Sequence, residues 1–206
     1  MWFQTWQINH RPDLYATPNL GEDTGKQINT FHLFVDFKSA FDTPHRDHLY
    51  ANMSEFGIPA KLIRLCEMTL KNAQCAVKVG NNLSAPFDAK RGFRQGDSLS
   101  CDFFNILMEK IICAAGIMPL ACADDVDIIG KSICEVEAAF FKVAEEARSI
   151  GLAVNESKTK LILLTAKDTS IGVSVQIDGY NFEVVKDFVY LGSSINSERH
   201  QSGNHM

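Results

Sequence analysis

The stretch Phe31-His32-Leu33-Phe34-Val35-Asp36 is a run rich in aromatic and β-branched residues that stops at a carboxylate. Residues of these types favour strands, so we predict a buried strand with Asp36 at its C-terminal end. A second pattern has the same character, because short apolar runs at 120–123 and 126–129 flank Asp124 and Asp125. Two such runs around a polar dipeptide predict a hairpin whose tight turn consists of the two acids.

The other main elements follow from the spacing of apolar residues and from turn and cap residues. We predict helices over 46–56, from Pro59 to 70, over 98–115, and from the Ser132 cap to Gly151. We predict a peripheral hairpin from strands at 75–79 and 83–90, and further strands at 160–164, 173–177, 180–185 and 188–191. This order of elements predicts an α+β domain, in which an antiparallel sheet has helices packed on one face.

The composition is that of an ordinary globular protein, with 206 residues of which 46% are hydrophobic. We therefore expect one domain over residues 30–194. Residues 1–29 show no firm period and contain several prolines and glycines, so we expect a weakly structured lead-in. We expect residues 195–206 to form a disordered tail.

The charge balance and the cysteines bear on partners and location. The formal net charge of −5 argues mildly against a chain that grips nucleic acid by itself, because phosphate binding rests on clustered lysine and arginine. The six cysteines form no C-x-x-C pair, and no apolar run approaches the roughly 18 residues of a membrane span. We expect an intracellular protein, nuclear or cytoplasmic, that is neither secreted nor inserted in a membrane.

The acids at the strand ends suggest metal-dependent chemistry. Phosphoryl transfer to a hydroxyl uses divalent metal, and metal needs several carboxylate oxygens at one place. Asp36 and Asp124 each follow a short apolar run, so in adjacent strands both would emerge at one edge of the sheet. In the alternative interpretation, Asp36 caps a strand end and Asp124-Asp125 is an ordinary turn, for which Asp is favoured. The residues alone leave both interpretations open.

Five motifs follow one another along the chain. The first three are Phe34-Val35-Asp36-Phe37-Lys38-Ser39-Ala40-Phe41-Asp42, Arg91-Gly92-Phe93-Arg94-Gln95-Gly96-Asp97-Ser98-Leu99-Ser100 and Ala121-Cys122-Ala123-Asp124-Asp125. The last two are Gly151-Leu152-Ala153-Val154-Asn155-Glu156-Ser157-Lys158-Thr159-Lys160 and Phe188-Val189-Tyr190-Leu191-Gly192-Ser193. In this order they resemble the motifs of reverse transcriptases of non-LTR, LINE-type retrotransposons, over about residues 31–194.

This resemblance implies the palm domain of an RNA-directed DNA polymerase, which transfers nucleotides to a primer 3′ hydroxyl. By the same resemblance, Asp36 and Asp124 would bind two Mg²⁺ ions, with Mn²⁺ as a substitute, and Asp125 would support them. The implied partners are an RNA template, a DNA primer and deoxynucleoside triphosphates.

The resemblance also implies a nucleotide pocket. Gln95 and Gly96 would line it, and Phe41 would exclude the ribose 2′ hydroxyl. Arg94 would meet a phosphate or the template. The alternatives are a plain strand-to-helix loop for Gln95 and Gly96, an apolar core position for Phe41, and a solvated side chain for Arg94.

Three residues downstream complete the implied site. Lys158 would act as the acid that protonates the leaving pyrophosphate, although an exposed lysine before a strand is an alternative. Tyr190 and Leu191 would belong to the strand that seats the primer end, with a core role as the alternative for Leu191.

The sequence departs from the family pattern around this palm. Relative to the family, we expect a fingers region reduced to residues 1–29 and no thumb after Ser193, and Cys122 replaces the usual aromatic residue. These departures predict a truncated copy with little activity alone. Two alternatives remain: an inactive retrotransposon-derived fragment that binds RNA or protein weakly, and a Mg²⁺-dependent nuclease or phosphatase, which would not need the 95–96 loop.

Overall fold

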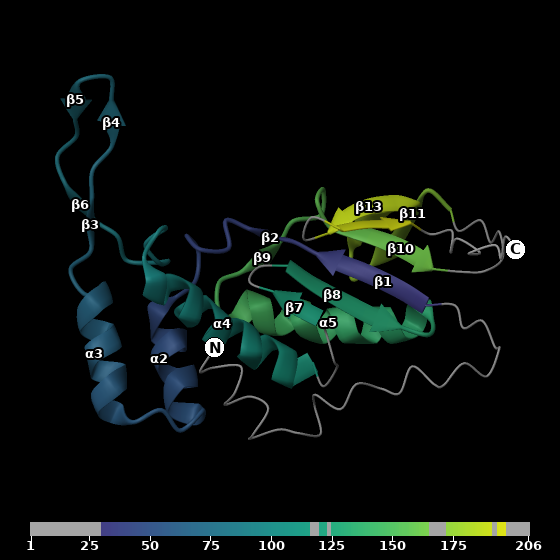
Figure 1. Ribbon diagram of the computed structural model, residues 1–206, viewed down its shortest axis with the longest axis horizontal. Coiled ribbons are helices and arrows are strands. Elements are labelled where there is room, and N and C mark those ends of the chain that lie inside the picture. The colour runs from purple at the N-terminus through teal and green to yellow at the C-terminus, as the bar shows by residue number, and fades with distance from the viewer. Residues whose placement is uncertain (1–29, 116–119, 123–124, 165–171, 191–192, 197–206) are drawn as a thin grey trace, which may run out of the picture.

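The computed structural model describes residues 30–115, 120–122, 125–164, 172–190 and 193–196. These residues form a central six-stranded sheet (Figure 1). Its strands are, in spatial order, β11 (Ser174–Ile177), β12 (Tyr180–Val184), β10 (Lys160–Leu164), β1 (Thr30–Val35), β8 (Asp125–Gly130) and β7 (Leu120–Cys122). The predicted first strand is therefore confirmed, and it lies in the middle of the sheet.

The sheet is mixed, whereas an antiparallel sheet was expected, because one pair of neighbouring strands is parallel. β1 runs antiparallel to β8 and β10, but β10 and β12 are parallel. The reason is a hairpin at Asp178-Gly179, where both residues have positive φ as a tight two-residue turn requires. β11 and β12 pair antiparallel, and this hairpin inserts its second strand next to β10. The expected α+β class is confirmed.

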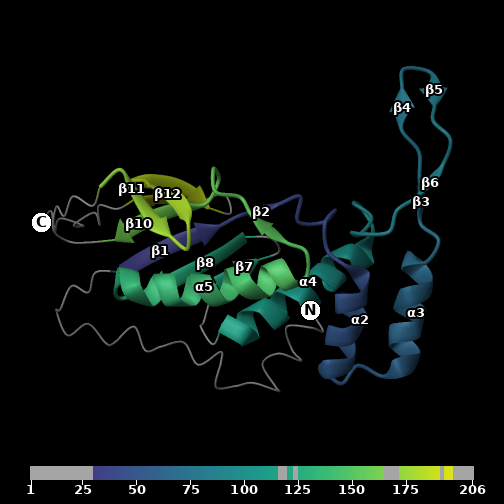
Figure 2. The same ribbon diagram turned by 180° about the vertical axis from the view of Figure 1, so that it is seen from behind.

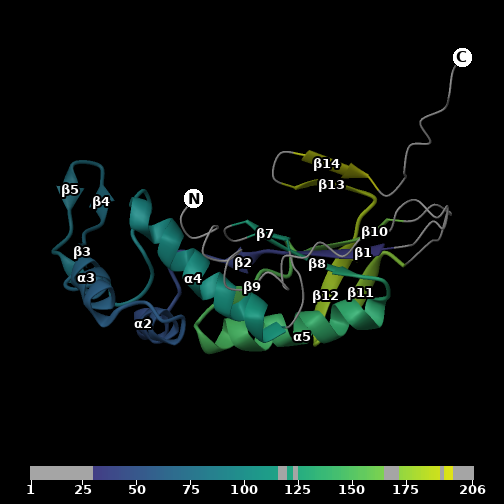
Figure 3. The same ribbon diagram turned by 60° about the horizontal axis from the view of Figure 1, so that its bottom comes forward.

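Helices α4 (Ser98–Ala115) and α5 (Ile133–Ser149) lie along the sheet, on the side away from the β13–β14 hairpin (Figure 3). Both helices were predicted, and the Ser132 hydroxyl caps α5 by accepting from the backbone N–H of Glu135. Leu33 and Val35 of β1 are buried in the core that these helices share. No helix in the described residues is long and apolar enough to cross a membrane.

Helices α2 (Arg46–Glu55) and α3 (Ala60–Leu70) stand beside the N-terminal part of α4 and lead into a long ribbon (Figures 1 and 2). The ribbon contains two short ladders, β3 (Gln74–Cys75) with β6 (Phe87–Asp88) and β4 (Lys78–Val79) with β5 (Asn82–Leu83). This is the predicted peripheral hairpin. Its turn is Gly80-Asn81, because Val79 pairs with Asn82 and Gly80 takes the positive φ.

Two further ladders were not predicted. β2 (Phe37–Lys38) pairs with β9 (Ala153–Val154), and β13 (Asp187–Tyr190) pairs with β14 (Ser193–Asn196). β14 extends through 195 and 196, so backbone pairing to β13 reaches the first two residues of the expected tail. The expectations for 1–29 and for the rest of the tail lie outside the described residues.

Candidate active site

Asp36 lies directly after β1, on the face of the sheet that α4 and α5 do not cover. Side chains alternate along a strand, so burial of Leu33 and Val35 under the helices turns Phe34 and Asp36 to the other face. There the Phe34 ring stacks on Phe188 of β13, with centroids 5.0 Å apart. A pocket of about 290 Å³ opens beside this pair, and it is lined by Phe34, Val35, Asp36, Ser157, Lys158, Lys160 and Phe188.

The backbone of Asp36 is fixed on both sides by one turn of the chain. Its N–H donates to the Thr159 hydroxyl at 3.2 Å, and its carbonyl accepts from the N–H of Asn155 at 2.8 Å. The Asn155 carbonyl in turn accepts from the N–H groups of Lys158 and Thr159. Thr159 is fully buried. The 155–159 turn therefore holds the strand end in place, a role that sequence reasoning did not assign to Asn155 or Thr159.

The Asp36 carboxylate has one unsatisfied oxygen. Its Oδ2 is buried and has no hydrogen-bond partner among the described residues. A buried carboxylate oxygen is costly without a hydrogen bond or a positive charge, so this atom fits a ligand for a cation. The donor type also fits, because Mg²⁺ prefers carboxylate oxygens.

The acidic hairpin begins beside Asp36. Val35 pairs with Val126 across β1 and β8, so continuing this antiparallel register brings Asp125 opposite Asp36. Asp125 itself pairs with Cys122, which makes it the first residue of β8 and corrects the expectation that it forms the turn. Asp124 and the side chain of Asp125 lie outside the described residues. The described residues contain no group of three or more His, Cys, Asp or Glu that could hold a metal ion.

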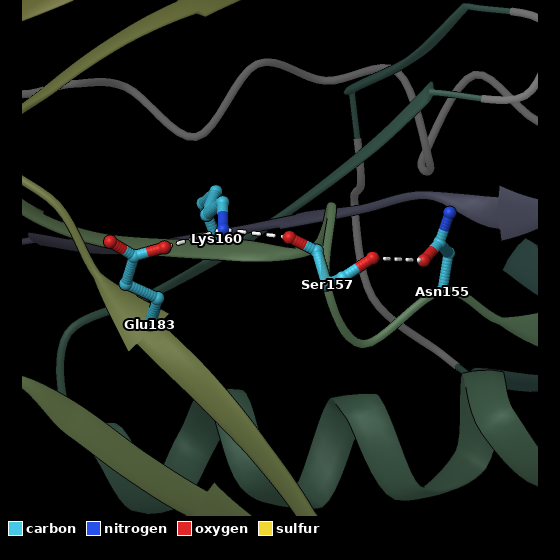
Figure 4. A network of polar contacts seen from close by, with 4 residues as sticks. All are labelled: Asn155, Ser157, Lys160 and Glu183. Atoms are coloured by element: carbon cyan, nitrogen blue, oxygen red, sulfur yellow. Dashed lines mark hydrogen bonds and ion pairs between the residues drawn. The ribbon is translucent and has the colours of Figure 1, made fainter.

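Two lysines at the pocket differ in their surroundings. The Lys160 ammonium lies 2.6 Å from a Glu183 carboxylate oxygen and donates to the Ser157 carbonyl at 2.7 Å (Figure 4). The Ser157 hydroxyl donates to the Asn155 side chain at 2.9 Å. Lys158, by contrast, is exposed and forms no ion pair with any described residue. Lys160 is thus occupied by structural contacts, whereas the ammonium of Lys158 is available at the pocket that Asp36 lines.

The predicted nucleotide residues do not line the Asp36 pocket, since Phe41 follows β2 and the other three lie on the 91–97 loop. The Phe41 ring is partly buried and stacks on Phe104 of α4, with centroids 4.9 Å apart. Its carbonyl accepts from the N–H of Phe93, which ties the 91–97 loop to the segment after Asp36. Arg94, Gln95 and Gly96 of that loop are exposed.

The loop also starts helix α4. Asp97 caps the helix, because its carboxylate accepts from the N–H of Leu99 at 3.1 Å, and the Ser100 hydroxyl donates to the Arg94 carbonyl. Tyr190 ends β13, but its side chain and Leu191 lie outside the described residues.

A second polar pair on the open face was not predicted. His32 Nδ1 lies 3.0 Å from Asp127 Oδ2, and His32 Nε2 lies 3.2 Å from the Thr30 hydroxyl. Asp127 is buried, and its Oδ1 has no hydrogen-bond partner among the described residues. Strand periodicity places His32 on the same face as Asp36, which is the sequence signal that could have revealed this pair.

Comparison with known proteins decides the family. Residues 6–195 match the sequence profile of the family described as reverse transcriptase (RNA-dependent DNA polymerase). The chain belongs to the reverse transcriptase family. The expected non-LTR kind is supported by two relatives. The Pol polyprotein of the R2 retrotransposable element of Popillia japonica is 26% identical over 193 residues, and a TX1 transposon protein of Xenopus laevis is 23% identical over 145.

Solved telomerase structures share the fold. Apo telomerase from Candida tropicalis superposes with a TM-score of 0.63 at 16% identity, covering 95% of this chain and 35% of the telomerase chain. This likeness supports a polymerase palm-like arrangement of sheet and helices. The reverse transcriptase chain described here spans only part of its relatives, since the R2 match covers 84% of this chain but 32% of the R2 protein, and the TX1 match covers 11% of the TX1 protein.

Proposed function

We propose that the chain is the palm region of an RNA-directed DNA polymerase that adds deoxynucleotides to a primer 3′ hydroxyl. The observation that carries this proposal is the buried Oδ2 of Asp36, which has no partner among the described residues. It lies at a pocket shared with Lys158, where the acidic hairpin begins. Membership of the reverse transcriptase family gives the reaction class.

The proposed metal ligands are Asp36 and Asp124, with Asp125 as a supporting acid and Mg²⁺, or Mn²⁺, as the metal. Two bound ions would make the primer 3′ hydroxyl more acidic and neutralise charge on the triphosphate. The chain contributes a fixed Asp36, because Asn155 and Thr159 hold its backbone on both sides. Such fixation lets the carboxylate receive a ligand without reorganising.

The roles proposed for the other site residues rest on their positions in the five motifs, and of these residues only Lys158 lines the Asp36 pocket. The exposed ammonium of Lys158 would donate a proton to the leaving pyrophosphate. The partly buried ring of Phe41 would pack against the sugar and leave no room for a 2′ hydroxyl. Arg94, Gln95 and Gly96 would contact the template and the incoming nucleotide from their exposed loop, and Tyr190 and Leu191 would seat the primer end.

The proposed partners are an RNA template, a DNA primer and deoxynucleoside triphosphates. One structural neighbour, the telomerase of Candida tropicalis, was solved in complex with a fragment of telomeric RNA, which supports RNA as a partner of this fold.

Primer extension on an RNA template tests the proposal. The purified chain is supplied with concentrated primer–template, deoxynucleotides and either Mg²⁺ or Mn²⁺, and product length is measured on a gel. We expect only weak extension, which Asp36→Asn or Asp124→Asn abolishes and which Glu145→Gln on the exposed side of α5 leaves unchanged. Extension that survives Asp36→Asn would exclude the proposed site. No extension in either metal, with folding intact, would favour the inactive RNA- or protein-binding module.

A further inference from the structure

The basic residues are concentrated in one part of the chain. Residues 60–94, which we name the basic arm, comprise α3, the ribbon of β3 to β6 and the return to Arg94. They contain seven lysines and arginines but only two acids, Glu67 and Asp88. The remaining 171 residues contain thirteen basic and twenty-three acidic residues. The overall charge of −5 therefore combines an arm of +5 with a remainder of −10.

All seven cations of the basic arm are exposed, and none forms an ion pair with any described residue. Apolar side chains are exposed beside them, among which Val79 is 72% exposed and Leu83 69%. Exposed aliphatic groups alternating with unpaired cations leave a surface that nothing in the described chain covers. The charge of this surface is complementary to a polyanion.

The two roots of the ribbon are fixed by one side chain. The Arg46 guanidinium donates to the Leu70 carbonyl at the end of α3, at 2.8 Å, and to the Gly92 and Arg91 carbonyls at 2.9 and 3.2 Å. The outgoing and returning strands are thus held together at the base. The returning root continues directly into the loop that carries Arg94, Gln95 and Gly96.

The ribbon projects on the same side of the sheet as the active-site face. Figure 3 shows the β4–β5 end of the ribbon and the β13–β14 hairpin rising on one side, while α5 lies on the other. Figure 1 shows the same relation from a second direction. A strand that leaves the open face of the sheet past the 94–96 loop would therefore meet the basic arm.

We propose that the basic arm binds single-stranded RNA, as the unpaired template on its way to the 94–96 loop. The identity of the strand rests on the proposed function, in which the unpaired strand is RNA. The cations would contact phosphates, and the exposed Val79, Leu83 and Phe87 would contact bases, which only an unpaired strand offers to apolar side chains. A duplex would leave those apolar groups in water.

Fluorescence anisotropy with a labelled, unstructured uridine homopolymer tests the proposal on the full chain. The arm variant is Lys78→Gln with Lys90→Gln. The matched control, Lys131→Gln with Lys142→Gln, removes two exposed lysines near or on α5, which lies on the other side of the sheet. Each lost phosphate contact lowers the salt slope by about 0.7, which corresponds to about fivefold weaker binding at about 0.1 M salt. We expect about 25-fold weaker binding for the arm variant and little change for the control.

Two results would exclude the arm as the binding surface. One is equal weakening of RNA binding in the arm variant and the control, and the other is a set of photo-crosslinks from the RNA that all fall outside residues 60–94.

Competition experiments identify the class of ligand. A duplex or a single-stranded DNA that competes as well as RNA would overturn the assignment to single-stranded RNA. The Asp36→Asn variant distinguishes failure of the RNA-binding proposal from failure of the proposed catalytic function. It should bind RNA normally through the arm but should not extend a primer.

Discussion

At the scale of single residues, the site depends on how Asp36 is held. Its backbone N–H and carbonyl are both satisfied by the 155–159 turn, while its Oδ2 is left without a partner among the described residues. The same turn carries Lys158 to the pocket. One five-residue segment thus places the proposed metal ligand and the proposed acid relative to each other.

Thr159→Val tests this arrangement. The substitution keeps the shape of the fully buried Thr159 side chain but removes the oxygen that accepts from Asp36, so the part-buried N–H of Asp36 loses its partner. We expect the free energy of unfolding in urea to fall by about 1–2 kcal/mol, and the metal concentration for half-maximal extension to rise. Thr159→Ser retains the hydroxyl and should restore the metal dependence. If Thr159→Val only lowers stability, with an unchanged metal requirement, the hydroxyl does not position Asp36.

At the scale of elements, the sequence-based predictions succeeded where a helix or strand is long enough for the spacing of its apolar residues to show a period. Helix α4 has the predicted bounds, and β1 and β10 lie where apolar runs placed them. The two-residue strands β2 and β9 were missed because so short a segment carries no period. The start of β8 at Asp125 was missed for another reason: pairing with Cys122 recruits a residue whose type favours a turn.

The sequence predicted only part of the candidate site, because it does not show which distant residues come into contact. The sequence identified Asp36 and Lys158, which the structure brings to one pocket, because both lie in motifs read from the chain itself. It did not identify Thr159, His32 or Asp127 as contacts. Their partners lie 123 and 95 residues away along the chain, and only the pairing of β1 with its neighbours brings them together.

The junction between the 91–97 loop and the segment after Asp36 is another contact between distant elements. A Cβ on Gly92 would lie 2.6 Å from the carbonyl oxygens of Phe41 and Asp42, and Gly92 has a φ of +68°. Gly57 has a similar φ of +74° but no atom within 4 Å of an added Cβ. Substitution of Gly57 by alanine therefore measures the cost of backbone strain alone. Substitution of Gly92 measures that cost together with the clash of the added Cβ with the Phe41 and Asp42 carbonyls.

We expect Gly92→Ala to lower the free energy of unfolding by about 3 kcal/mol or more, and Gly57→Ala by about 1 kcal/mol. Urea unfolding of both variants measures the difference. Equal losses would mean that the loop relaxes away from Phe41 at little cost, and the junction would then not be a rigid link between the loop and the strand end.

At the scale of the whole molecule, the net charge and the distribution of charge lead to different expectations for nucleic-acid binding. The value of −5 argued against a chain that grips nucleic acid by itself, yet the sum conceals a basic arm of +5. Phosphate binding responds to the local arrangement of cations, so the distribution of charge decides it. The separation of charge along the chain is visible in the sequence. Only the structure shows that the cations of the arm are exposed and that the ribbon projects on the active-site side of the sheet.

This distribution predicts how the chain holds a primer–template. The β13–β14 hairpin contacts the active-site face through the stacking of Phe188 on Phe34, and the residues outside the basic arm carry a net charge of −10, which repels a duplex. We expect the chain to bind an RNA–DNA primer–template with a Kd of about 10⁻⁴ to 10⁻⁶ M, the range of nonspecific binding. Anisotropy at several salt concentrations measures this. If about three phosphate contacts form, doubling the salt from about 0.1 M should weaken binding about fourfold or more.

The basic arm should matter only for the unpaired part of the template. Lys78→Gln with Lys90→Gln should weaken binding of a primer–template with a long unpaired RNA overhang, and should have little effect on a blunt duplex. A nanomolar Kd that is insensitive to salt would mean that the sheet face itself grips the duplex, and equal effects on overhanging and blunt substrates would place the arm along the duplex.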